Sequence, residues 1–125
     1  MDYVSYHPYS SDGDYSDEVS VMTFLQNFEY VQQQLGKDIP VWITEFGTST
    51  KTSDGRVVLS FEQQAADLAR TIIAAKSEPM LKYLNIYNFR AKENVESPRE
   101  QNFGIVSGDF NAKPAFIALS YLNRT

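Results

Sequence analysis

One carboxylate at the end of an apolar run is the strongest chemical signal in this sequence. Residues 41–47 read Val-Trp-Ile-Thr-Glu-Phe-Gly, so Glu45 closes an apolar segment just before a glycine and a polar loop. A short apolar run bounded by turn residues is typical of a strand buried in a parallel sheet. An unpaired carboxylate is costly to bury, and active sites in α/β folds lie at the carboxyl ends of strands. Glu45 is therefore the first candidate for a catalytic residue.

The elements that must position Glu45 alternate between strands and helices. Hydrophobic spacing and turn residues predict, in order, strand 3–6, helix 17–35, strand 39–46, helix 61–77, strand 83–89 and helix 114–122. Gly36 should cap the first helix, and Ser60 with Gln63 has the spacing of a capping box at the start of the second. Strands that alternate with helices form right-handed βαβ units and a parallel sheet. Three such strands leave two unpaired edges, so we expect the chain to be a piece of something larger.

Composition and charge limit the classes of function. The chain has 125 residues and a net charge of −5, and its acidic balance with no basic stripe argues against a nucleic-acid partner. No apolar run approaches the roughly 20 residues that span a bilayer, so we expect no membrane insertion. The sequence contains no cysteine and one histidine, and its carboxylates are scattered. We therefore expect neither a metal site nor a cofactor.

Three segments together resemble one group of enzymes. They are Tyr6-His7-Pro8-Tyr9, the run 40–47, and Tyr87-Asn88-Phe89 with residues 100–105 and 113–115. In this order and at this spacing they are similar to the C-terminal part of the clan A glycoside hydrolases, which are retaining enzymes built on a TIM barrel. The segments resemble the end of the sixth strand, the seventh strand that ends in the nucleophile, and the eighth strand with its long loop and last helix. Cellulase-like and xylosidase-like members look most similar.

The resemblance implies a fold and a domain organisation. Residues 1–125 would be the C-terminal portion of a TIM-barrel catalytic domain, an α/β fold of which they supply the last three βα units, strands six to eight. A full barrel takes roughly 250 residues. The clan's general acid/base is a glutamate that ends the fourth strand, and nothing in this chain can be that residue. Met1 directly before the first strand also favours a truncated piece. We expect little hydrolysis by the chain alone, and association either with the remaining barrel units, in cis or in trans, or with itself.

The resemblance also implies an activity and a set of site residues. The reaction would be hydrolysis of β-linked oligo- or polysaccharides by double displacement, with Glu45 as the nucleophile. His7 and Tyr9 would line the sugar pocket and orient Glu45 or a substrate hydroxyl. Tyr87 and Asn88 would contribute to the floor of the pocket. No metal would take part.

Plainer interpretations of the same residues stay open. Glu45 could be solvated in an exposed turn, His7 could be an ordinary loop histidine, and Tyr87 could belong to the core. Because side chains alternate along a strand, Glu45 should share a face with Val41 and Ile43. If that face is the barrel axis, Trp42 packs beneath the helices as a core residue.

We expect the loop after the third predicted strand to be a solvated rim of the sugar pocket. It carries mixed charges, which are the norm for a surface: Arg90, Lys92, Glu93, Arg99 and Glu100.

Two other classes of function remain possible. One is a non-catalytic carbohydrate-binding or scaffold protein derived from the barrel, which would bind sugar even without the Glu45 carboxylate. The other is a compact three-unit α/β domain that dimerises and uses Glu45 for unrelated acid/base chemistry. The cellular location is open, since the relatives are commonly exported but the first residues lack the basic segment and apolar core of a signal peptide.

Overall fold

The computed structural model describes residues 3–9, 17–35, 39–92 and 95–124, with side chains given from residue 21 onward in the first helix. Within these ranges the elements are β1 (Val4–Tyr6), α1 (Asp17–Leu35), β2 (Val41–Phe46), α2 (Phe61–Ser77), β3 (Leu81–Ile86), α3 (Pro98–Gln101) and α4 (Pro114–Leu122). The bounds of the three long helices are those that the sequence predicts. Gly36 and Glu93 lie outside the described residues.

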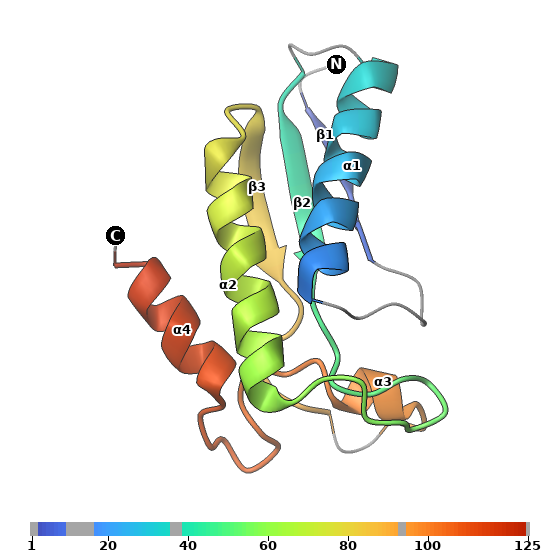
Figure 1. Ribbon diagram of the computed structural model, residues 1–125, viewed down its shortest axis with the longest axis vertical. Helices are drawn as coiled ribbons and strands as arrows, with labels where there is room; N and C mark the ends of the chain where they lie inside the picture. The colour runs from blue at the N-terminus through green and yellow to red at the C-terminus, as the bar shows by residue number, and fades with distance from the viewer. Residues whose placement is uncertain (1–2, 10–16, 36–38, 93–94, 125) are drawn as a thin grey trace.

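The strands form one open parallel sheet in the order β1-β2-β3. Val4 pairs with Val41 and Trp42 pairs with Tyr83, so the chain crosses over through α1 and then through α2. Figure 1 shows α1 and α2 side by side on one face of the sheet, with α4 beyond α2. The predicted α/β class and the parallel sheet are confirmed.

The core lies between the sheet and helices α1 and α2. Phe24 and Phe28 stand one helical turn apart on α1 and are almost completely buried against Val41 and Ile43 of β2. Leu68 of α2 completes this contact at 1% exposure. Each such side chain stabilises the fold by about 1.5–3 kcal/mol relative to leaving it in water. This packing fixes the strand that carries Glu45.

The start of α2 follows directly from its sequence. The Oγ of Ser60 accepts a hydrogen bond from the amide of Gln63 at 3.1 Å, and the Gln63 side chain accepts one from the Ser60 amide at 2.8 Å. The predicted capping box is therefore confirmed, and two amides that the helix leaves unpaired are satisfied.

The third strand differs from its prediction. It runs over Leu81–Ile86 instead of 83–89. The prediction placed it too late because Tyr87 and Phe89 are good strand formers. In the structure the carbonyls of Asn88 and Phe89 accept hydrogen bonds from residues 105 and 106, so this segment leaves the ladder with β2. The second strand begins at Val41, later than predicted, and α3 lies in a segment that was predicted to be loop.

Trp42 does not pack beneath the helices, which was the position expected for it if Val41, Ile43 and Glu45 faced a barrel axis. Val41 and Ile43 face the helices, whereas the Trp42 ring stacks on Tyr3 at 4.3 Å and lies 5.5 Å from Tyr83, on the other face of the sheet. The ladder is irregular between Ile43 and Phe46, and Phe46 returns to the helix-facing core. The simple alternation that linked Glu45 with Val41 therefore breaks before Glu45.

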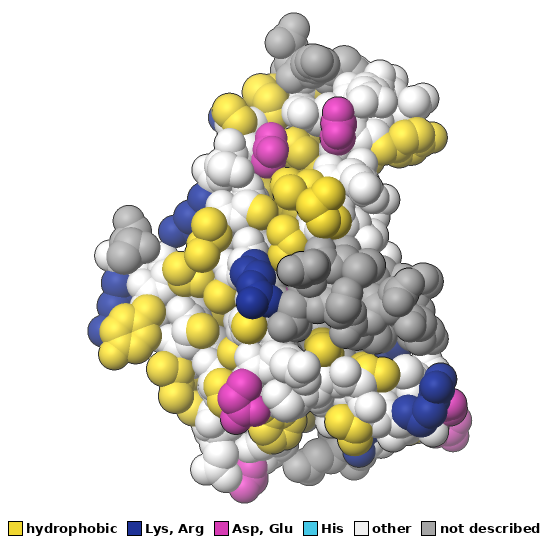
Figure 2. Space-filling view, in the orientation of Figure 1, with side chains coloured by type: hydrophobic (Ala, Val, Ile, Leu, Met, Phe, Trp, Pro, Cys, Tyr) yellow, Lys and Arg dark blue, Asp and Glu magenta, His cyan; other side chains and the backbone are white. Residues whose placement is uncertain are grey.

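The helix-covered face carries apolar side chains among charged ones (Figure 2). Several large apolar side chains of α2 and α4 are more than half exposed, namely Ile73, Ile117 and Tyr121. A groove of about 550 Å³ is lined mostly by apolar residues of α2, β3 and α4, and also by Lys76, Lys82 and Ser120. In the parts of the chain that the structure describes, no helix is long and apolar enough to cross a bilayer.

Candidate active site

Glu45 and two of the predicted pocket residues meet at the carboxyl ends of β1 and β2. The Tyr9 hydroxyl donates a hydrogen bond to Oε1 of Glu45 at 2.6 Å. Nδ1 of His7 lies 3.6 Å from the other carboxylate oxygen, a distance that suits an electrostatic contact better than a hydrogen bond. The side chain of Glu45 keeps 34% of its surface exposed, so the carboxylate is held and still accessible.

Thr44 fixes the other side of the histidine ring. Its Oγ1 lies 3.1 Å from Nε2 of His7, so the imidazole bridges a hydroxyl and a carboxylate on successive residues of β2. This role could not be predicted, because a threonine inside an apolar run is typical of an ordinary strand.

Tyr9 is held in its neutral, donating form. Burial raises the pKa of the phenol well above its usual range, and the hydrogen bond to Glu45 and the charges of Glu45 and Glu100 raise it further. A phenol that stays protonated acts as a permanent donor to the carboxylate. The Tyr9 hydroxyl therefore orients Glu45 and keeps its proton over the ordinary pH range.

Tyr87 stands at the same end of the sheet, with a carboxylate of its own. Its hydroxyl donates to Oε2 of Glu100 at 2.9 Å, and the Lys92 ammonium donates to the same hydroxyl. Glu100 was predicted to be part of a solvated rim, and this is wrong: it is part-buried and hydrogen-bonded. Its place could not be predicted because it depends on the path of an irregular loop.

Asn88 takes a different position from the other predicted site residues. Its backbone carbonyl accepts from the amide of Ile105 at 3.1 Å, which ties the loop to the end of β3. Its side-chain Oδ1 is buried, and no hydrogen-bond partner for it exists among the described residues. Contact of this side chain with a sugar remains a prediction.

Phe103 links the two tyrosines. Its ring, 2% exposed, meets Tyr9 edge-on at 5.8 Å and Tyr87 edge-on at 5.3 Å. Edge-to-face pairs of this kind are worth about 0.5–1.5 kcal/mol beyond the burial of area. In the sequence Phe103 stands out only as a member of the run 100–105 that resembles part of the glycoside hydrolases, and no role for its ring was predicted.

Gly47 allows the two strand ends to approach. A Cβ at this position would lie 1.7 Å from the carbonyl oxygen of Tyr87, so no other residue fits without moving the backbone. The amide of Tyr87 also donates to the carbonyl of Phe46 at 2.6 Å. The glycine after Glu45 is thus what brings Tyr87 beside it.

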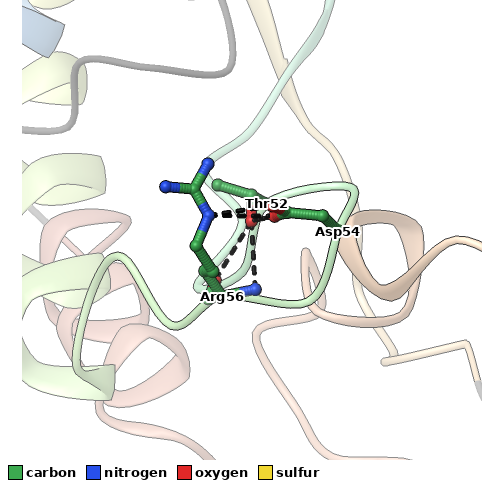
Figure 3. Close-up of polar contacts among 3 residues, drawn as sticks. All are labelled: Thr52, Asp54 and Arg56. Carbon is green, nitrogen blue, oxygen red and sulfur yellow. Dashed lines mark hydrogen bonds and ion pairs between the residues drawn. The ribbon is translucent and has the colours of Figure 1, made fainter.

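The loop after Gly47 is anchored at both ends. Thr48 donates to the buried Asp67 of α2, and Gln64 donates to the Thr48 carbonyl at 2.7 Å. Farther out, Arg56 donates to Asp54 at 2.9 Å and its amide donates to Thr52 at 3.1 Å (Figure 3). The Thr52 hydroxyl and then Arg56 lower the pKa of the exposed Asp54 carboxyl. These contacts hold the turn and have no part in the site chemistry.

Nothing in the described part of the chain gathers the ligands of a metal ion. No group of three or more histidine, cysteine, aspartate or glutamate side chains suitable for one occurs there. The side chains that meet at the strand ends are two carboxylates, two phenols, an imidazole and an ammonium. Such a set can orient a carboxylate and donate hydrogen bonds to hydroxyl-rich ligands.

The chain is similar to parts of several solved structures. A family 39 glycoside hydrolase from Bacteroides cellulosilyticus WH2 matches 98% of this chain at a TM-score of 0.68 and 24% identity. A GH5_18 protein from Bifidobacterium longum subsp. infantis matches 98% at 0.77 and 22%. The β-glucuronidase of Bifidobacterium dentium, in complex with coumarin-3-O-glucuronide, matches 98% at 0.71 and 20%.

The matches cover only part of each known protein. The chain spans 27%, 30% and 20% of the lengths of these three structures, respectively. No protein-family model matches the sequence, and no curated protein sequence matches it either. Two of the matched proteins are glycoside hydrolases and the third is a β-glucuronidase. At these identities the comparisons show that the chain shares the fold of one part of such glycoside hydrolases.

Proposed function

We propose that this chain is the part of a retaining β-glycoside hydrolase that carries the nucleophile, Glu45. The observation that supports this most is the hydrogen bond of 2.6 Å from Tyr9 to Glu45 at the carboxyl end of a parallel strand. The fold shared with glycoside hydrolase structures supports it independently. The substrate class is β-linked oligo- or polysaccharides.

The mechanism is double displacement. Glu45 attacks the anomeric carbon and forms a covalent glycosyl ester, while a second carboxyl group about 5–5.5 Å away protonates the departing oxygen. Water then attacks the same carbon and releases the sugar with its original configuration. Tyr9 and His7 orient Glu45 for the attack. As the ester forms, Tyr9 loses its hydrogen bond to Oε1 of Glu45.

The acid/base comes from outside this chain. Glu100, the second carboxylate at the site, accepts a hydrogen bond from Tyr87 and lies near the Lys92 ammonium, which suits a bound acceptor and not a proton donor. The chain would therefore supply units six to eight of a barrel. Its groove of about 550 Å³ and its exposed apolar side chains fit contact with the remaining units, or otherwise with another copy.

Leaving-group dependence tests this proposal. A glycoside whose leaving group departs without protonation does not need the acid/base, whereas one with an alkyl leaving group does. We expect the chain to release 2,4-dinitrophenol slowly from dinitrophenyl β-glycosides, to leave methyl β-glycosides intact, and to lose the first activity in Glu45→Gln. Equal release by the chain and by Glu45→Gln would contradict the proposal.

A second candidate is carbohydrate binding without catalysis. The observation in its favour is the row of Tyr3, Trp42 and Tyr83 on the open face of the sheet, since two of these rings are about half exposed. This function predicts binding of an oligosaccharide that is unchanged in Glu45→Gln and lost in Trp42→Ala. The same binding measurement therefore separates the two candidates.

A further inference from the structure

A chain of two hydrogen bonds, the relay, joins Lys92, Tyr87 and Glu100 at the site. The Lys92 ammonium donates to the Tyr87 hydroxyl, which donates to Oε2 of Glu100 at 2.9 Å. The ammonium also lies 4.7 Å from the centre of the Tyr87 ring, so the ring face and the hydroxyl both hold it. One phenol thus connects an exposed cation to a part-buried anion.

The rest of the site holds this relay in place. Phe103 packs edge-on against the Tyr87 ring at 5.3 Å, and the carbonyl of Tyr87 rests against Gly47. Two other cations near this loop have partners elsewhere. Arg90 donates to the carbonyl of Gly108, and Lys113 donates to the carbonyl of Gly104 at 2.7 Å.

A backbone contact places the partner of Lys92 next to the strand end that carries Glu45, because the amide of Tyr87 donates to the carbonyl of Phe46 at 2.6 Å. The hydrogen bond to Tyr87 raises the pKa of the Lys92 ammonium, and the negative charges of Glu100 and Glu45 raise it further. An isolated surface lysine would turn freely in water at a cost of side-chain order. Here contacts with both the ring and the hydroxyl of Tyr87 favour one position.

We infer that Glu100 and Tyr87 are positioning residues that hold the Lys92 ammonium at the carboxyl ends of the strands, the edge of the sheet where Glu45 lies. An ammonium has three N–H donors, and the contact with Tyr87 uses one of them. The other two can bind a ligand at the site. If the proposed function is right, these donors bind hydroxyl groups of the sugar next to the one that Glu45 attacks. The positioning itself does not depend on that function.

Two variants separate the parts of the relay. Tyr87→Phe keeps the ring and its contact with the cation but removes both hydrogen bonds. Glu100→Gln keeps an acceptor for the Tyr87 hydroxyl but removes the charge. Tyr83→Phe is the matched control, because Tyr83 is an exposed tyrosine of β3 that packs on Trp42.

The test is the NMR titration of the lysine Cε–Hε signals in the full chain. We expect the pKa of Lys92 to fall toward the ordinary lysine value in Tyr87→Phe, to fall by less in Glu100→Gln, and to be unchanged in Tyr83→Phe. If a variant unfolds at alkaline pH, ammonium proton exchange near neutral pH replaces the titration and should be faster in Tyr87→Phe. A Lys92 signal that is the same in all four proteins would overturn the inference.

A second measurement separates the relay from the function. Cellobiose is added to the chain, and the Lys92 signals are followed. We expect them to shift, and to shift less in Tyr87→Phe. If Lys92 titrates as expected but cellobiose leaves its signals unmoved, the positioning stands and the sugar contact is wrong.

Discussion

The Tyr9 hydroxyl lies 2.6 Å from Oε1 of Glu45, although 36 residues separate the two in the chain. Each residue lies at or just beyond the carboxyl end of its strand, and β1 and β2 are neighbours in the sheet. The parallel arrangement alone therefore brings the two side chains to one edge. The hydrogen bond then selects one orientation of the carboxylate.

Loss of this hydrogen bond should slow the reaction of Glu45. Tyr9→Phe removes the hydroxyl and keeps the ring contact with Phe103. Since hydrogen bonds to charged groups are worth about 1.5–3 kcal/mol, we expect a fall of roughly 10- to 100-fold in the rate of dinitrophenol release. Tyr121→Phe, on the exposed face of α4, is the control and should react like the parent. A Tyr9→Phe chain with the parent rate would show that Tyr9 does not orient the nucleophile.

The same tyrosine should give the fold a dependence on alkaline pH. Its pKa is raised in the folded chain, so the folded state keeps the proton when the unfolded state loses it. The stability from Tyr9 is then fully present below its unfolded pKa of about 10 and is lost as the pH rises from there toward the folded pKa. Urea unfolding from about pH 8 to pH 11 should show a steeper loss in the parent than in Tyr9→Phe. Parallel curves would mean that burial does not favour the neutral phenol.

Replacement of Gly47 should break the junction between the strand ends. In Gly47→Ala the new methyl group would meet the Tyr87 carbonyl oxygen at 1.7 Å, and this oxygen belongs to the backbone, which cannot give way as a flexible side chain can. We expect a loss of more than about 3 kcal/mol in the free energy of unfolding, or no folded protein. Gly55→Ala is the comparison, because its neighbours stand 3.6 Å away and only its φ of 87° is unfavourable. Its cost should be about 1–2 kcal/mol, measured by the same urea transition.

Truncation of Phe103 should loosen both tyrosines together. Phe103→Ala should cost about 3–5 kcal/mol of stability, as for other buried phenylalanines. Phe103→Leu keeps most of the volume and loses the edge-on ring contacts with Tyr9 and Tyr87. In Phe103→Leu we expect a smaller loss of stability but faster ring flipping of both tyrosines by NMR. Faster flipping of one ring alone would contradict the shared contact.

The sequence predicted the helices and the meeting of Glu45 with its neighbours for simple reasons. The apolar spacing of α1 and α2 is regular over many turns, and Ser60 with Gln63 marks a helix start by its own hydrogen bonds. Glu45 and Tyr9 come together because adjacent parallel strands end at one edge. These features depend on local chemistry and on topology alone.

The features that were missed depend on irregular backbone. Trp42 lies on the open face because Val41 and Ile43 face the helices, and the break in the ladder after Ile43, which no periodic pattern could show, separates Glu45 from their face. Glu100, Lys92 and Phe103 reach the site through a loop held by backbone contacts with the end of β3. Their residue types were visible, but their positions were not.

Covalent trapping tests the central claim most directly. A 2-deoxy-2-fluoro β-glycoside with a dinitrophenyl leaving group can form the glycosyl ester without an acid/base and hydrolyses slowly afterwards. Intact mass followed by peptide mapping should find one sugar on Glu45 in the parent chain and in Glu62→Gln, and none in Glu45→Gln. An adduct on another residue, or no adduct on the parent chain, would contradict the assignment of Glu45 as the nucleophile.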